Sequence, residues 1–187
     1  PDYAEVNYNL GLALQELEQL YTAVEYYKKA IAIQPDYAEA HNNLGNSFLE
    51  LGQLDDAVKS YEKAIATQPD YVEAHNNLGS IFMELGQMDD AVKSYEKALA
   101  LKPNDADGYN KLGIVYMELD QTDVALKCYK KALALNPDNA KAHANRGDAM
   151  KRLNRLDEAL ASYESAIALN PNLDYVFNDY LHTRMNL

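Results

Sequence analysis

One position that returns every 34 residues carries an amide side chain in four copies and an amine in the fifth: Asn9, Asn43, Asn77, Lys111 and Asn145. Four more asparagines lie beside or near these residues, at Asn42, Asn46, Asn76 and Asn110. An amide both donates and accepts hydrogen bonds, so a row of amides can hold a peptide backbone whatever its sequence. These nine residues are the candidate peptide-binding site, and the recurring position is called the asparagine ladder below.

A second interpretation of the asparagine ladder is structural. Amides at a repeated position can hydrogen-bond one repeat to the next, or can simply persist from duplication of the repeat, and the sequence leaves both interpretations open. A carboxylate also returns at the 34-residue interval, at Glu16, Glu50, Glu84 and Glu118. This acidic row predicts a neutral or basic ligand for the ladder, because an acidic ligand would be repelled.

The sequence shows no grouping suited to catalysis or metal binding. Three of the four histidines share one repeat position, which places them on separate repeats: His41, His75 and His143. The adjacent aspartates at 55–56 and 89–90 fit the starts of helices better than an acid–base pair. We therefore expect no catalytic residue, no metal site and no cofactor. The single cysteine, Cys128, excludes an internal disulfide and is typical of a reducing compartment, which predicts a cytoplasmic protein.

Prolines set the organisation of the chain. They stand 34 residues apart throughout, at positions 1, 35, 69, 103, 137 and 171. A fixed period of this length is typical of stacked structural repeats, in which each unit buries its apolar face on its neighbours. The spacing predicts a single array over residues 1–187, with repeats at 1–34, 35–68, 69–102, 103–136 and 137–170, and a terminal segment at 171–187.

Each repeat is predicted to contain two helices of about 14 residues, roughly 21 Å long. In the second repeat, Asp36 with Glu39 three residues later matches an N-terminal capping pattern. Gly52 can end the first helix in a left-handed conformation. Asp55 and Asp56 follow at the start of the second helix, which Pro69 terminates. The sequence therefore predicts an all-α fold.

Small residues mark the places where the paired helices approach closely. One repeat position is glycine in all five copies: Gly11, Gly45, Gly79, Gly113 and Gly147. Glycine inside a helix lowers stability by roughly 0.5–1 kcal/mol relative to alanine. Its presence at this position in all five repeats therefore predicts that a Cβ would clash with the partner helix. Two departures occur elsewhere. Arg146 replaces a leucine, and the residue equivalent to Gly52 is Glu18, Asp120 or Asn154 in three repeats.

Residues 171–187 do not follow the repeat pattern. They contain apolar residues at helical spacing, at Val176, Phe177, Tyr180 and Leu181. This stripe predicts one helix that packs on the end of the array, because a terminal repeat has an uncovered face.

The net charge of −12 argues against nucleic acid and anionic membranes as partners, since both attract clusters of Lys and Arg. The charge is uneven along the chain. Residues 1–102 hold 7 basic and 17 acidic residues, a net of −10, and residues 103–187 hold 10 and 12, a net of −2. The first residues have neither the basic start nor the apolar core of a signal peptide.

The recurring residues resemble those of a tetratricopeptide repeat (TPR) array over residues 1–170. In the third repeat the family pattern is matched by His75, Leu78, Gly79, Phe82, Ala91, Tyr95, Ala98 and Pro103. The resemblance implies a right-handed α-solenoid of five helix-turn-helix repeats with a C-terminal capping helix. It also implies that the asparagine ladder lines a concave groove in which extended peptides lie.

Three functions are compatible with this resemblance. The first is a non-catalytic protein–protein interaction module that binds an extended segment of another protein. The second is a region that presents substrates within a bacterial-type protein O-glycosyltransferase, since the ladder and the last 14 residues are similar to the TPR region of O-linked N-acetylglucosamine transferase-like enzymes. The third is a scaffold that self-associates end to end.

Overall fold

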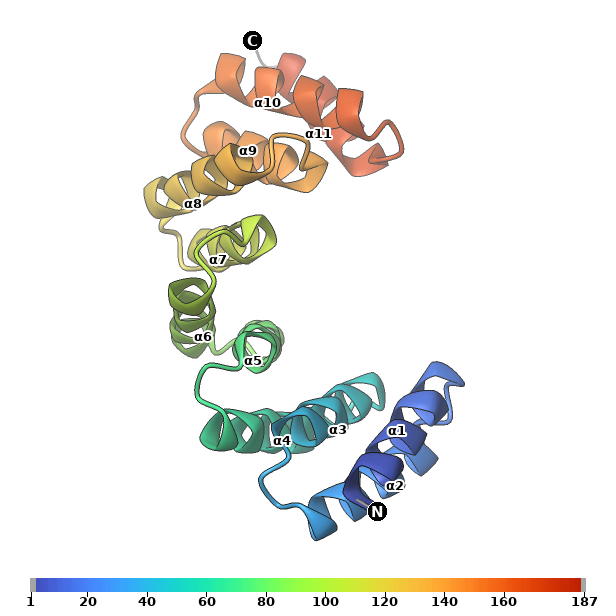
Figure 1. Cartoon of the computed structure of the whole chain (residues 1–187). Helices are drawn as coiled ribbons and strands as arrows, with labels where there is room; N and C mark the ends of the chain where they lie inside the picture. Colours follow the sequence, from blue (N-terminus) through green and yellow to red (C-terminus); the bar gives the residue numbers. More distant parts are fainter. Residues whose placement is uncertain (1–2, 186–187) are drawn as a thin grey trace. The chain divides into compact units, whose positions relative to one another are not determined.

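The computed structural model describes residues 3–185, so Pro1 and the last two positions of the predicted terminal segment lie outside the described residues. The described residues form two compact units, one up to residue 86 and the other from residue 87 onward. The boundary falls inside the third predicted repeat, between its two helices (Figure 1). Each unit is therefore described by itself.

The first unit consists of five helices: α1 (Tyr3–Glu16), α2 (Leu20–Ile33), α3 (Ala38–Glu50), α4 (Leu54–Thr67) and α5 (Val72–Glu84). The second unit consists of six: α6 (Met88–Leu101), α7 (Ala106–Glu118), α8 (Thr122–Leu135), α9 (Ala140–Arg152), α10 (Leu156–Leu169) and α11 (Asp174–Arg184). Every predicted repeat thus holds two helices of 13 or 14 residues, and no strand occurs within residues 3–185. This confirms the all-α prediction.

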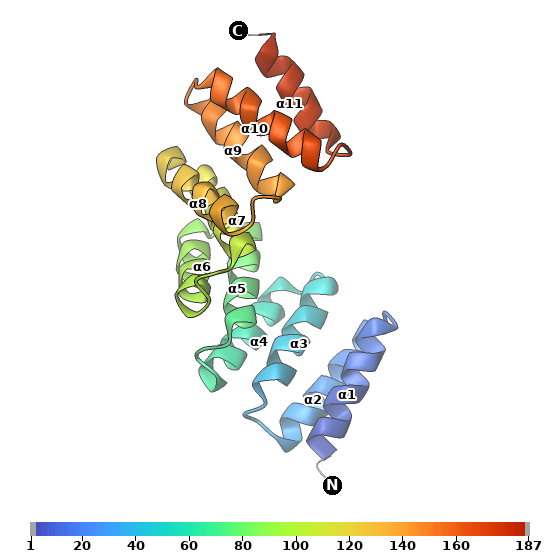
Figure 2. The same ribbon diagram turned by 45° about the horizontal axis from the view of Figure 1, so that its top comes forward.

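Within each unit, helices that follow one another in the chain pack side by side (Figures 1 and 2). In the first unit α1 pairs with α2 and α3 with α4, and α2 and α4 also contact the first helix of the next repeat. In the second unit α7 pairs with α8 and α9 with α10, while α11 packs on α10. None of the helices in the described part of the chain has the length and apolar character needed to cross a membrane.

Each of the four pairs that lie inside one unit is built around a tyrosine of its second helix. Tyr61 is fully buried and packs on Gly45 of the first helix, where an added Cβ would lie 2.6 Å from its ring carbon Cε1. The same contact joins Tyr27 to Gly11, Tyr129 to Gly113 and Tyr163 to Gly147. The predicted close approach at the recurring glycine is therefore confirmed at these four copies, and the group that fills the space is a tyrosine ring.

The turn between paired helices requires a left-handed residue. Gly52 and Gly86 have φ of +72° and +73°, which confirms the predicted helix end at Gly52. The residues that replace this glycine adopt the same conformation, with φ of 58° at Glu18, 59° at Asp120 and 58° at Asn154. Since a left-handed conformation strains a residue with a Cβ, the three substituted repeats keep the turn at a cost.

The prediction that Asp36 caps α3 is wrong. The residue before the helix is Tyr37, and its side chain makes no capping hydrogen bond. Asp36 instead lies inside a turn that the Tyr37 N–H closes by donating to the Gln34 carbonyl at 3.2 Å. A side-chain cap occurs where a polar residue takes the place of Tyr37. Asp105 accepts from the N–H of Gly108, and Asn139 accepts from that of Ala142, each at 3.0 Å.

The terminal helix α11 packs on α10 as predicted, but only some of the apolar residues predicted to pack are buried. Val176 is fully buried with Tyr163 and Ala166 of α10, and Tyr180 packs against the same cluster. Phe177 and Leu181 remain 49% and 42% exposed, so their assignment to the packing stripe is wrong. Leu181 occupies the repeat position of Gly147, which faces Tyr163 on the second helix of its pair, and α11 has no such partner within the described residues.

We expect Gly45→Ala to destabilise the protein by about 1–3 kcal/mol, because the new methyl group would overlap the Tyr61 ring. The free energy of unfolding in urea measures this loss. In a Tyr61→Leu background the same substitution is expected to cost much less, since the overlapping ring carbons are gone. An equal cost in both backgrounds would contradict the proposed contact.

We expect Glu18→Gly to stabilise the protein by up to about 1 kcal/mol, because glycine adopts the left-handed turn without strain. Asn154→Gly is the matched comparison and should gain less, since asparagine tolerates this conformation better than glutamate. Urea midpoints of the two variants and the parent chain test the ranking. Equal gains at both positions would refute this account.

Candidate functional site

The nine predicted binding residues divide between the two units. Six lie in the first unit, on α1, α3 and α5: Asn9, Asn42, Asn43, Asn46, Asn76 and Asn77. Three lie in the second unit, on α7 and α9: Asn110, Lys111 and Asn145. All nine belong to the first helix of their repeat. The structure therefore divides them into two sets, one on each unit.

In the first unit, the ladder amides hydrogen-bond across the repeats. The Asn43 amide Nδ2 donates to the Tyr8 hydroxyl at 2.9 Å, which joins α3 to α1. The Asn77 amide Nδ2 donates to Oδ1 of Asn42 at 3.2 Å and to Oδ1 of Asn46 at 3.1 Å, which joins α5 to α3. The contacts expected from the structural interpretation of the ladder are thus present, and they also hold the amides in fixed orientations.

These amides form one side of a pocket of about 570 Å³. Its lining comes from three successive repeats: Tyr8, Asn42, Asn43, Asn46, Tyr71, Glu73, Asn76 and Asn77. We call this set the amide pocket. Five predicted binding residues line it, whereas Asn9 is exposed and does not. Tyr71 was not predicted. The return of tyrosine at positions 3, 37 and 71 is the signal that could have identified it.

One atom in the amide pocket lacks a partner. Oδ1 of Asn76 is buried, and no hydrogen-bond donor reaches it from the described residues. A buried carbonyl oxygen without a donor costs about 1–3 kcal/mol relative to one that is satisfied. Because this oxygen is closed to solvent, an N–H or O–H group of a ligand would satisfy it only once the Asn76 side chain turns toward the pocket.

The charge of the amide pocket is negative. Glu73 lines it, and no Lys or Arg is among its lining residues. Burial, followed by the charges of Glu39 and Glu73, raises the pKa of Tyr71 to about 12. Burial and Glu39 likewise raise the pKa of Tyr8. Both phenols therefore stay neutral at physiological pH and can donate hydrogen bonds.

In the second unit, the ladder residues lie in a different environment. The Asn145 amide Nδ2 donates to Oδ1 of the buried Asn110 at 2.9 Å, again linking two repeats. The Lys111 ammonium lies 6.0 Å from the centre of the Tyr95 ring. Asn145 lines a pocket of about 180 Å³ that charged residues also border: Glu118, Asp148 and Arg152. In the described part of the second unit, the predicted binding residues thus form one amide pair, in place of the five amides that line the pocket of the first unit.

Asp148 supports the buried tyrosine of the fifth repeat. It accepts a hydrogen bond from the Tyr163 hydroxyl at 2.7 Å. In the second repeat Asn46 accepts the equivalent bond from Tyr61, also at 2.7 Å. Burial raises the pKa of the Asp148 carboxyl above its usual range, because the charged form loses hydration.

Three of the histidines contact the backbone, and the cysteine is buried. His41 Nε2 lies 3.0 Å from the carbonyl oxygen of Pro35, and His75 and His143 make the equivalent contact with Pro69 and Pro137. Cys128 is buried, and burial followed by the charge of Glu96 raises its pKa to about 11, so the thiol stays protonated. Within residues 3–185 no three His, Cys, Asp or Glu side chains are grouped to hold a metal ion.

Two family models describe most of the chain. Both are tetratricopeptide repeat models, one matching residues 42–106 and 110–174 and the other residues 2–70. The chain belongs to the tetratricopeptide repeat family. TPR proteins bind protein or peptide partners, and membership in the family supports a protein-interaction module.

Solved TPR structures share this fold. A crystal structure of MamA is 27% identical, covers 86% of this chain and 94% of its own, and has a TM-score of 0.82. YrrB, described as a TPR protein with an unusual peptide-binding site, is 22% identical, covers 92% and 89%, and has a TM-score of 0.80. A TPR protein from Parabacteroides merdae is 20% identical, covers 99% and 73%, and has a TM-score of 0.88. The curated proteins compared with the chain include no match.

We expect Asp148→Asn to raise the melting temperature of the TPR protein at pH 7. A carboxyl whose pKa is raised by folding destabilises the fold where it is ionised, and this penalty disappears as the pH falls through its folded pKa toward about 4. Asparagine carries no charge and can accept the Tyr163 hydrogen bond, as Asn46 does from Tyr61.

Thermal unfolding between pH 4 and pH 8 measures the effect, with the exposed Asp138→Asn as the control. The advantage of Asp148→Asn should grow as the pH rises, and that of Asp138→Asn should stay near zero. A gain that is constant with pH would show that the charge of Asp148 is not its cause.

Proposed function

We propose that this chain is a non-catalytic protein-interaction module whose first unit binds an extended segment of another protein in the amide pocket. The observation that supports this most directly is the buried, unpartnered Oδ1 of Asn76. Native structures leave few such atoms without a partner. Once the Asn76 side chain turns toward the pocket, a backbone N–H of a bound peptide would supply the missing donor.

The chemistry of the pocket suits a peptide backbone. An extended peptide presents N–H and C=O groups at every residue. Asn76 and Glu73 offer acceptors for its N–H groups, and the neutral hydroxyl of Tyr71 can donate to its carbonyl groups. These contacts involve the backbone, so the module would bind segments of varied sequence.

The ligand is expected to be neutral or basic. Glu73 lines the pocket, and the charge of Glu39 acts on Tyr8 and Tyr71 beside it. An acidic segment would meet these carboxylates with no cation among the lining residues to offset them. A lysine or arginine in the ligand would be attracted.

The hydrogen bonds between repeats support binding by fixing the pocket before a ligand arrives. Asn43, Asn46 and Asn77 are each held by another residue of the network. A site whose side chains are already ordered loses little conformational entropy on binding. The structural interpretation of the asparagine ladder and the binding interpretation therefore apply together in the first unit.

We expect Asn76→Ala to weaken peptide binding about tenfold while leaving the fold intact. The substitution removes a buried acceptor that has no partner, so folding loses no hydrogen bond, and the bound state loses one worth about 1–1.5 kcal/mol. The probe is an array of short neutral and basic peptides, followed by titration of the best binder by fluorescence anisotropy. Urea unfolding checks stability.

The matched control is Gln53→Ala, which removes an exposed amide of the first unit outside the pocket. Its peptide affinity should match that of the parent chain. Asn77→Ala provides a contrast, because it breaks two hydrogen bonds between repeats and should lower both affinity and stability. Unchanged affinity in Asn76→Ala, with full binding by the parent, would overturn the assignment of the pocket.

A further inference from the structure

A cavity in the second unit has the opposite electrostatic character to the amide pocket. It lies where α8, α9 and the start of α10 meet, and has a volume of about 340 Å³. Four of its six lining side chains are cations and two are apolar: Lys127, Lys130, Arg146, Arg155, Leu126 and Met150. We call this set the basic notch. It stands out in a chain whose net charge is −12.

We propose that the basic notch binds an acidic segment of a protein, with carboxylates on either side of an apolar side chain. This site is separate from the amide pocket, which lies on the other unit and favours the opposite charge. The proposal therefore does not rest on the proposed function.

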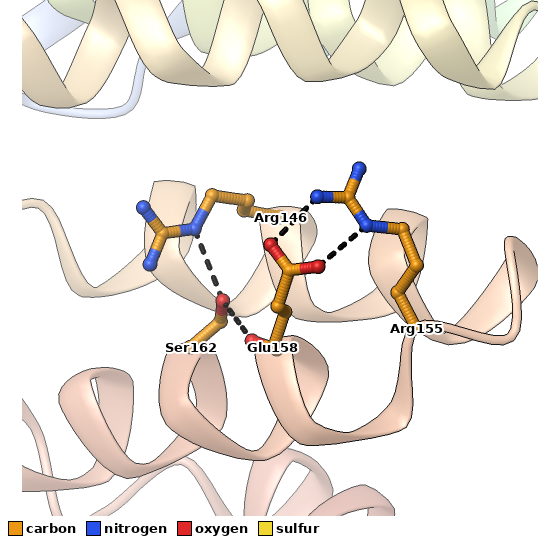
Figure 3. A network of polar contacts seen from close by, with 4 residues as sticks. All are labelled: Arg146, Arg155, Glu158 and Ser162. Atoms are coloured by element: carbon orange, nitrogen blue, oxygen red, sulfur yellow. Dashed lines mark hydrogen bonds and ion pairs between the residues drawn. The ribbon is translucent and has the colours of Figure 1, made fainter.

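Arg146 is the centre of the notch. It is half-buried, and its Nε donates to the Ser162 hydroxyl at 3.0 Å. Ser162 in turn donates to the backbone carbonyl of Glu158 at 2.8 Å. This chain of bonds fixes the guanidinium plane, and its two terminal nitrogens point away from Glu158 (Figure 3). They are positioned to bind a carboxylate through two parallel hydrogen bonds.

The carboxylate nearest to Arg146 is already engaged. Both oxygens of Glu158 accept hydrogen bonds from Arg155, each at 2.6 Å (Figure 3). Within residues 3–185, neither Lys127 nor Lys130 pairs with a carboxylate, and the hydrogen bond of Arg146 goes to the neutral Ser162. The notch therefore holds two lysines that form no ion pair within the described residues, while the charge of Glu158 acts on Arg146 without a hydrogen bond between the two side chains.

The equivalent place between the first and second repeats shows which residues differ in the notch. The residues 102 positions earlier, three repeat lengths before those of the notch, carry no net charge: Val24, Glu25, Lys28, Leu44, Phe48 and Gln53. There Leu44 is buried in one apolar cluster with Val24 and Phe48. In the notch, Arg146 stands in place of Leu44, and cations also replace Glu25 and Gln53. The notch thus keeps two apolar lining residues, Leu126 and Met150, while the residues around them are cations.

This combination selects for a short acidic and apolar segment. Leu126 and Met150 offer apolar surface to a leucine-like side chain, and the surrounding cations attract its acidic neighbours. A nucleic acid would present a longer line of phosphates and would need a continuous basic stripe. The notch is confined to one cavity on an otherwise acidic chain, so we favour a protein ligand.

The test uses the whole chain and fluorescence anisotropy. The probe is a labelled peptide of sequence Glu-Asp-Leu-Asp-Glu, and its neutral analogue is Gln-Asn-Leu-Asn-Gln. We expect the acidic peptide to bind saturably, to weaken as salt is added, and to bind more tightly than the analogue. Equal binding of the two peptides, or tighter binding of an oligothymidine of similar charge, would overturn the proposal.

The decisive variant is Arg146→Leu, which restores the leucine found at Leu44, Leu78 and Leu112 and should therefore fold. We expect it to weaken the acidic peptide about tenfold or more, as for the loss of a charged hydrogen-bond pair. Arg184→Leu removes the same charge from an exposed position on α11 and should change the affinity less than twofold. Equal losses in both variants would show a general charge effect and refute the site.

Discussion

The contact between a buried tyrosine and a glycine sets the close approach of the helix pairs within each unit. Because the Tyr61 ring occupies the space that a Cβ at Gly45 would need, the two helices approach more closely than they could with a larger residue at this position. The Tyr61 hydroxyl then reaches Asn46 on the first helix, and Asn46 also accepts from Asn77 of the next repeat. A core contact inside one pair thus orients an amide of the candidate site and connects it to the neighbouring pair.

The two candidate sites use the repeat in different ways. The amide pocket is assembled from residues that keep the repeat pattern, since Asn42 and Asn76 are equivalent, as are Asn43 and Asn77. The basic notch arises where the pattern is broken, at Arg146. The uneven distribution of charge along the chain, −10 over residues 1–102 and −2 over residues 103–187, agrees with the opposite electrostatic characters of these sites.

The 34-residue period was enough to predict the helix pairs, because proline, glycine and the spacing of apolar residues act locally. The capping residue was assigned wrongly since Asp36 lies in a turn that only the backbone hydrogen bond of Tyr37 reveals. Phe177 and Leu181 have helical spacing, but spacing alone does not tell which flank of α11 has a neighbour. Sequence identified most of the amide pocket, whereas the role of Tyr71 and the unpartnered oxygen of Asn76 depend on contacts between repeats.

The hydrogen bonds that link the repeats have a consequence for how the protein acquires its structure. They connect residues about one period apart, such as Asn43 to Tyr8 and Asn145 to Asn110, each separated by 35 positions. Topologies with such short sequence separations have low contact order and fold quickly. Folding can then begin at any helix pair and spread to its neighbours, so an altered side chain in one repeat, such as Arg146, disturbs assembly only nearby and leaves distant repeats free to diverge.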